Sequence, residues 1–228
     1  MPARLFTVAG SDKITLSLGA LGFAFGPGSM AFIFRLTNLS QTQVVFSAGA
    51  TNTVGYRLQA TTGTGIINVV LAGGAVSTTA LTSGKWYCVG YSKATGTATA
   101  RFHIYDYAAG TWVHENASAT QANSSVPVTR AAFGSIQAVG SPLAGDIAMG
   151  GVWNVVLSDS QFEPLAYDLN GWFAPAQPKG LWLIDQDATT QNVIDQSGNG
   201  ANQSGLTATA LSTGSVPVFS RGAPMVAA

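Results

Sequence analysis

The side chains best suited to chemistry in this 228-residue chain are oxygen-bearing residues near its C-terminal end: Asp185, Asp187, Asp195 and Asn199. Carboxylate and amide oxygens are the ligands that calcium prefers, and one ion takes roughly six to eight of them. These residues therefore form a candidate calcium site. The alternative is structural, because Asp and Asn beside Ser and Gly commonly cap turns.

Aromatic side chains offer a second kind of chemistry, the stacking of sugar rings on a rigid apolar platform with a polar edge. Trp86 and Trp153 fall within apolar strands, so we expect them in the core. Other aromatic residues lie near expected strand ends or loops: Tyr105, Tyr107, Trp112, Trp172 and Phe173. We assign carbohydrate binding to Tyr105, Tyr107 and Trp112. The alternative is that at least half of these rings pack in the core or in an interface.

The remaining reactive residues give weaker signals. His103 shares a strand face with Arg101 and Tyr105, which favours a surface or interface role over metal binding. The other histidine is His114. Cys88 is the only cysteine, so we expect no internal disulfide and a small buried side chain in place of a catalytic thiol. The chain has no P-loop and no G-x-S-x-G nucleophile pattern followed by an acid and a histidine.

The charge content limits the partners. Charged residues make up 9% of the chain, with ten basic and ten acidic side chains, against roughly 25% charged in typical soluble proteins. Nucleic acid requires a basic surface, so we expect neither a nucleic-acid partner nor attraction to an anionic membrane. A near-neutral, charge-poor surface tends to associate. We therefore expect a homo-oligomer or a place in a larger assembly.

Short apolar runs separated by glycine-containing turns predict an all-β sandwich or barrel. The run Lys85–Lys93 and the run Arg101–Tyr107 are expected to form a hairpin. Residues 116–129 carry few large apolar side chains and are predicted to be a loop. Further strands are predicted on either side of the turn at residues 10–12 and over Met30–Leu36, Val44–Ala48, Val54–Ala60, Ile66–Leu71, Val76–Leu81 and Ala132–Val139.

The stretch from Gly145 to Gly171 combines two patterns. Alternation from residue 145 to 157 predicts a strand with Ile147, Met149 and Trp153 on one face. Ser158 and Gln161 then have the spacing of a helix capping box. Because Pro164 cannot donate a backbone hydrogen bond, we predict a short or broken helix that ends at Gly171.

Several of these patterns occur together in a known family. They are F-x-x-x-G-S-D-x-I-x-L from Phe6 to Leu16, L-x-x-G-x-W-Y-x-V from Leu81 to Val89, and G-D-I-A-x-x-x-V-W-N-x-x-L-S from Gly145 to Ser158. In this order they resemble the laminin G-like members of the concanavalin A-like lectin/glucanase jelly rolls. The resemblance implies an all-β, two-sheet antiparallel jelly-roll sandwich with one short helix, and an adhesive or glycan-binding role.

The resemblance also suggests a division of the chain. We expect residues 1–174 to form the laminin G-like jelly roll. Residues 175–228 are expected to pack back on the sandwich or to extend as an arm, with an edge strand in the charge-poor tail. The D-x-S-G-N-G sequence from Asp195 to Gly200 is similar to a segment that usually precedes such domains, whereas here it follows.

Hydrolases of the resembled fold carry closely spaced carboxylates on one strand, in a pattern such as E-x-D-x-E. A retaining glycosidase needs two carboxyl groups about 5 Å apart. The only glutamates are Glu115 and Glu163, and neither has an acidic residue at strand spacing. We therefore predict that the chain is not an enzyme and needs no cofactor, apart from the candidate calcium ion.

The resembled fold normally works outside cells, yet the chain shows no export signal and no disulfides. Bacteriophage virion proteins reconcile these facts, because they fold in the host cytoplasm and act outside it. We therefore expect a non-enzymatic virion protein of the capsid or tail, bound to other virion subunits and able to bind host-surface glycans. A free extracellular bacterial carbohydrate-binding module is the alternative, and a degenerate glycoside hydrolase or lyase is a third.

Overall fold

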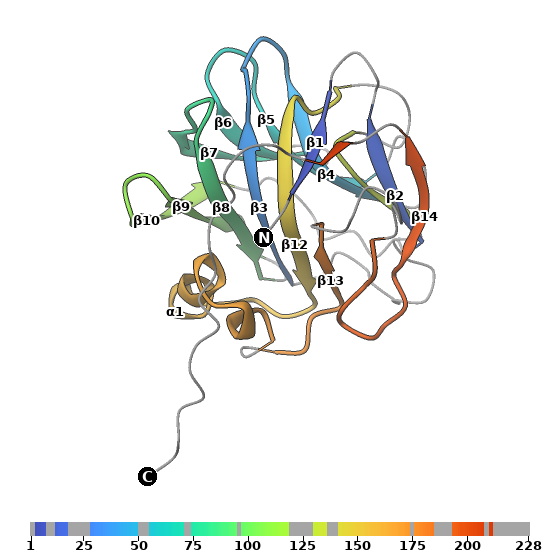
Figure 1. The fold of residues 1–228 in the computed structure, drawn as a ribbon. Helices are drawn as coiled ribbons and strands as arrows, with labels where there is room; N and C mark the ends of the chain where they lie inside the picture. The colour runs from blue at the N-terminus through green and yellow to red at the C-terminus, as the bar shows by residue number, and fades with distance from the viewer. Residues whose placement is uncertain are drawn as a thin grey trace.

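The chain folds as a sandwich of two antiparallel β-sheets (Figure 1). This structure, a computed structural model, describes residues 3–7, 12–17, 28–49, 55–70, 74–94, 97–118, 130–135, 141–173, 176–184, 193–207 and 210–211. The all-β, two-sheet jelly-roll prediction is confirmed. Among the described residues no helix has the length and apolar character required to cross a bilayer.

Sheet A has the strand order β10-β9-β8-β3-β12-β1-β15, with β13 also paired to β12. The bounds of these strands are β10 Thr111–Ser118, β9 Thr99–Asp106, β8 Trp86–Lys93, β3 Gly28–Leu36, β12 Gly145–Trp153, β1 Arg4–Phe6, β15 Ala210–Leu211 and β13 Gly180–Leu183.

Sheet B has the order β14-β2-β11-β4-β5-β6-β7. Its strands are β14 Gln203–Thr207, β2 Lys13–Ser17, β11 Arg130–Phe133, β4 Gln43–Gly49, β5 Gly55–Ala60, β6 Ile66–Val70 and β7 Ala75–Ala80. The C-terminal segment thus contributes strands to both sheets, since β13 and β15 lie in sheet A and β14 lies at the edge of sheet B.

The core between the sheets is built on aromatic rings. Phe32 of sheet A stacks on Phe46 of sheet B with 4.7 Å between ring centroids, and Phe133 contacts both rings. Trp182 of β13 lies 5.5 Å from Phe133 and donates its indole N–H to the carbonyl of Ala201 at 2.8 Å. Aromatic pairs add about 0.5–1.5 kcal/mol each beyond their area burial, so these rings hold the C-terminal segment against the sandwich.

A second apolar layer covers the outer face of sheet A. It is formed by three short helices: α1 (Asp159–Phe162) and the 3₁₀ helices η1 (Glu163–Ala166) and η2 (Leu169–Trp172). The predicted capping box is present, because Gln161 Oε1 accepts a hydrogen bond from the Ser158 N–H at 2.9 Å. The helix is short and broken, as predicted: α1 ends at Phe162, and Pro164 lies in the 3₁₀ helix η1 that follows. The expected end at Gly171 is wrong by one residue, since η2 continues to Trp172.

Two other predictions for sheet A need correction. The alternation predicted for β12 breaks at a register irregularity between Ile147 and Met149. As a result Ile147 packs in the core between the sheets, whereas Met149 and Trp153 pack in the outer layer. The loop predicted at residues 116–129 begins too early, because β10 extends to Ser118.

The open edges of the two sheets meet where β10 lies beside β7. The Glu115 carboxylate on β10 accepts hydrogen bonds from the backbone N–H and hydroxyl of Thr78, at 2.7 Å and 2.6 Å. It also accepts from the Thr79 hydroxyl at 2.8 Å and, at longer distance, from the Thr79 N–H. Glu115 therefore satisfies two backbone donors of an edge strand and joins the two sheets.

Replacing Glu115 with Gln is expected to lower the free energy of unfolding by about 1–2 kcal/mol at pH 7, because hydrogen bonds to a charged acceptor are lost. Desolvation raises the pKa of Glu115, but the hydrogen bonds from Thr78 and Thr79 outweigh it and hold the pKa below its ordinary value. A depressed folded-state pKa stabilises above the unfolded pKa of about 4.3 and stops doing so as pH falls through the folded value.

Urea denaturation of wild type and Glu115→Gln at pH 7 and at about pH 3 measures this effect. The difference between the two proteins is expected to shrink at the lower pH. Glu163→Gln is the matched control, because the Glu163 side chain is half exposed at 49%. A difference that stays the same at both pH values would contradict the role given to the Glu115 charge.

Candidate functional site

The candidate site lies on the outer face of sheet A, where the β9–β10 hairpin meets α1. Alternate residues of a strand point to opposite faces, and Phe102 and Ile104 of β9 pack in the core between the sheets. Arg101, His103 and Tyr105 therefore point outward. The hairpin register pairs them with outward-facing residues of β10, in the pairs Arg101–Asn116, His103–His114 and Tyr105–Trp112.

The aromatic group of the site consists of Tyr105, Tyr107 and Trp112, the residues predicted to bind carbohydrate. The structure brings these rings together: the centroid of Tyr105 lies 5.0 Å from that of Tyr107 and 5.2 Å from that of Trp112. All are half-buried and pack against the outer apolar layer. Trp112 lies in the edge strand β10, not in the loop expected from the sequence. Carbohydrate binding by this group stays a prediction.

The hydroxyl of Tyr107 fixes this group to the helical segment formed by α1, η1 and η2, because it donates a hydrogen bond to the carbonyl of Ala166 at 2.5 Å. Burial raises the pKa of Tyr107 far above its ordinary value, so the hydroxyl keeps its proton and remains a donor. Trp172, the last residue of η2, is fully buried and donates its indole N–H to the carbonyl of Leu165. It therefore belongs to the core, whereas Phe173 is exposed.

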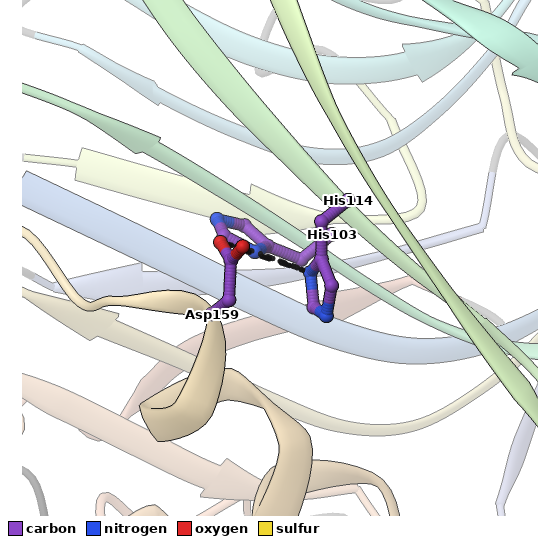
Figure 2. A group of neighbouring side chains, drawn as sticks. All are labelled: His103, His114 and Asp159. Atoms are coloured by element: carbon purple, nitrogen blue, oxygen red, sulfur yellow. Dashed lines mark hydrogen bonds and ion pairs between the residues drawn. The ribbon is translucent and has the colours of Figure 1, made fainter.

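The second part of the site, the histidine–aspartate cluster, consists of His103, His114 and Asp159 (Figure 2). The Nδ1 atoms of the two histidines lie 3.0 Å apart. Asp159 Oδ1 lies 3.4 Å from His103 Nδ1 and 3.9 Å from His114 Nδ1. The predicted surface placement of His103 is wrong, because its side chain is fully buried beneath α1.

Neighbouring groups hold this cluster in place. The ring of His103 stacks on Phe162 with 3.8 Å between centroids, and its Nε2 lies 3.0 Å from the Ser92 hydroxyl. Burial, and next the adjacent His114, lower the pKa of His103 to about 3, so His103 is neutral at neutral pH. Arg101 hydrogen-bonds both carboxylate oxygens of Asp159 and so holds the pKa of that carboxyl below its usual range.

The predicted calcium ligands fall in a different region. Asp185 and Asp187 lie outside the described residues. The carboxylate of Asp195 accepts hydrogen bonds from the N–H groups of Leu181, Ser197 and Ala201, at 2.9, 2.9 and 3.1 Å. Asn199 donates its side-chain N–H to backbone carbonyls at 3.1 and 3.3 Å. Both residues thus support turns in the way the structural alternative describes, and calcium binding there stays a prediction.

Sequence reasoning missed the partnership of the two histidines with Asp159. It did so because β10 was not predicted, and without that strand there is no register to place His114 beside His103. The sequence placed Asp159 only at the start of a predicted helix and gave no reason to expect it near the histidines. Its contact with the hairpin depends on how the helical segment folds back over sheet A.

Comparisons with known proteins identify the fold. No model of a known protein family matches the chain, and no curated protein matches it either. The chain is similar to the structure of a proposed carbohydrate-binding protein from Bacteroides ovatus, with a TM-score of 0.66, 14% identity and coverage of 95% of this chain and 61% of that protein. This chain therefore spans less than two thirds of that protein's length.

Two further structures are similar. A heptameric SAP-like pentraxin from Limulus polyphemus matches with a TM-score of 0.57 and 13% identity, over 92% of this chain and 94% of the pentraxin. Tailspike protein 2 from Escherichia coli O157:H7 bacteriophage CAB120 matches with a TM-score of 0.53 and 16% identity, over 80% of this chain and 26% of the tailspike.

The resemblance to laminin G-like jelly rolls is also supported. Domains LG4–5 of the mouse laminin alpha1 chain match with a TM-score of 0.51 and 14% identity, over 69% of this chain and 43% of that one. At these low identities the similarities establish the fold alone. The chain has the two-sheet jelly-roll fold of these proteins.

Removing the Tyr107 hydroxyl tests how much its hydrogen bond contributes to the attachment of the helical segment to the hairpin. Replacing Tyr107 with Phe is expected to lower the free energy of unfolding by about 1 kcal/mol, because the hydrogen bond to the Ala166 carbonyl is lost while the ring packing remains. Chemical denaturation measures this change. Tyr105→Phe is the control, since the Tyr105 hydroxyl has no hydrogen-bond partner among the described residues, and equal losses in the two variants would count against the attachment.

Proposed function

We propose that this chain is a non-catalytic adhesion module of a bacteriophage virion that binds host-surface glycans through the aromatic group Tyr105, Tyr107 and Trp112. The observation that carries the glycan part is the grouping of these half-buried rings on one outward-facing strand edge. Rings of this kind bind the apolar face of a sugar, while nearby polar side chains bind its hydroxyl groups. Asn116 and Arg101 carry such polar groups on the same face, in the register pair that follows His103–His114.

The absence of a paired-carboxylate arrangement on the glutamates supports a non-catalytic role. Glu115 points to the core side of β10 and is occupied by Thr78 and Thr79. Glu163 lies in η1 on the outer side of sheet A, where its carboxylate is 3.7 Å from His114. The two glutamates therefore lie on opposite faces of the same sheet, an arrangement that does not place two carboxyl groups across one glycosidic bond.

The virion part of the proposal has two supports. The charge-poor composition suits a surface that is largely covered by neighbouring subunits, and a phage tailspike contains a domain of similar fold. A free extracellular carbohydrate-binding module is the second candidate, favoured by the similarity to the Bacteroides ovatus protein.

Removing the Trp112 ring tests glycan binding. On a glycan array, the wild-type chain is expected to bind at least one host-surface glycan. Trp112→Ala is expected to bind it at least about tenfold more weakly, a loss of roughly 1.4 kcal/mol. Tyr167→Ala is the matched control, because Tyr167 is an exposed aromatic residue of the helical segment outside the aromatic group. An array without a single bound glycan, or equal binding by wild type and Trp112→Ala, would refute the glycan proposal.

The oligomeric state separates the virion protein from a free module. Light scattering at micromolar concentration is expected to give a mass that is a multiple of the 23.4 kDa chain, since a charge-poor surface favours association. The reading frames beside its gene are expected to encode portal or tail proteins. A monodisperse monomer whose gene lies among polysaccharide-degrading enzymes would instead support the free module.

A further inference from the structure

We propose that His103, His114 and Asp159 form a binding site for a divalent transition-metal ion of the zinc class, which fastens α1 to the β9–β10 hairpin. This site does not depend on the glycan-binding proposal. Its ligand atoms are two imidazole nitrogens and one carboxylate oxygen, a donor set that suits zinc and related ions. Calcium is disfavoured, because it takes roughly six to eight oxygen ligands.

The spacing of the three ligand atoms supports a metal ion. Zinc binds nitrogen and oxygen ligands at about 2.0–2.2 Å, which for tetrahedral geometry places any two ligand atoms about 3.3–3.5 Å apart. The observed separations are 3.0 Å between the two Nδ1 atoms, and 3.4 and 3.9 Å from these to Asp159 Oδ1. Shifts of a few tenths of an ångström in the side chains would therefore complete three corners of a tetrahedron.

The groups behind the rings can accept the protons of the tautomers that a metal needs. A histidine that binds metal through Nδ1 carries its proton on Nε2 and usually donates it to a neighbouring acceptor. The Ser92 hydroxyl lies 3.0 Å from His103 Nε2 and can accept that proton. The Glu163 carboxylate faces His114 Nε2 at 3.7 Å. Nε2 of His114 is otherwise buried without a hydrogen-bond partner among the described residues.

With both protons on Nε2, the two Nδ1 acceptors lie 3.0 Å apart and within 3.9 Å of the anionic Asp159 Oδ1. Arg101 pairs with the carboxylate, but the two facing Nδ1 acceptors remain unfavourable unless a proton or a cation lies between them. In the absence of a cation, one ring must keep a proton on Nδ1 and donate it to the other. A bound metal ion takes the place of that hydrogen bond.

The surroundings make the site rigid and leave it a path to solvent. His103 stacks on Phe162, and His114 stacks on Trp112 with 9° between the ring planes. Arg101 fixes the orientation of the Asp159 carboxylate, whose Oδ1 keeps a second lone pair for the metal. Asp159 has 36% of its side chain exposed, so an ion can enter on that side and water can fill the fourth position.

Zinc titration of the full-length chain, prepared without a histidine tag and stripped of metal, tests the proposal. Calorimetry is expected to show one zinc ion per chain. At a free zinc concentration about 100 times the dissociation constant, the melting temperature is expected to rise by about 5–10 °C. Calcium and magnesium chloride at the same concentration are expected to give no shift. Cobalt bound at the same site is expected to give the visible absorption of a four-coordinate complex.

Variants assign the binding to these residues. Asp159→Asn keeps the side-chain shape and is expected to weaken zinc binding at least about tenfold, and His114→Phe keeps a ring against Trp112 and is expected to abolish it. Ser92→Ala, which removes the acceptor behind His103, is expected to weaken binding by about 10–100-fold. Asp106→Asn is the control. Its carboxylate lies on β9, the strand of His103, but it pairs with Lys85 and is not part of the cluster, so zinc binding is expected to stay unchanged.

Absence of zinc binding by the wild-type chain would overturn the proposal, and so would binding that persists unchanged in Asp159→Asn and His114→Phe. If His114→Phe does not fold, Asp159→Asn and Ser92→Ala decide the outcome. Because the glycan array uses neither zinc nor these variants, a failure of one proposal is distinguishable from a failure of the other.

Discussion

The packing of Phe162 against a glycine is the contact on which the outer layer of this molecule depends. A Cβ atom on Gly90 of β8 would lie 2.3 Å from Cε1 of Phe162, so no other residue at this position leaves room for the ring. Gly151 of β12 similarly makes room for Trp153 and Trp172. These glycines let the helical segment lie flat on sheet A, with the result that β8 and β12 are buried on both faces.

Most of the fold follows from local pattern in the sequence. Strands such as β3 and β8 are predictable because dense apolar runs bounded by turn residues have few other ways to bury their side chains. β10 was not predictable in the same way, since Trp112, Val113 and Ala117 are its only apolar residues and its pairing with β9 comes from the hairpin as a whole. The irregularity before Met149 likewise depends on how β12 pairs with β3, and a strict alternation of inward and outward residues cannot predict it.

The site was predictable in part for the same reason. The aromatic group lies close together on one hairpin, so residue type and proximity in sequence were sufficient to select Tyr105, Tyr107 and Trp112. The histidine–aspartate cluster combines the paired strands β9 and β10 with the start of α1, which follows β12 in the chain. Nothing in the spacing of His103, His114 and Asp159 links them. Turn-capping and calcium binding use the same side chains at Asp195 and Asn199, and only the positions of the backbone donors reveal the capping role.

The two parts of the site are connected through one pair of rings. Trp112 belongs to the aromatic group, and it stacks on His114 of the histidine–aspartate cluster at 5.4 Å between ring centroids. A cation held by His114 and Asp159 would restrict the His114 ring, and through it the Trp112 ring, before any sugar arrives. Because ordering a side chain on binding costs about 0.5–1.5 kcal/mol, restricting Trp112 in advance would favour the proposed sugar, and by linkage the sugar would favour the proposed cation to the same extent. The Phe162–Gly90 contact supports both parts, since it positions α1 and therefore Asp159 against the hairpin.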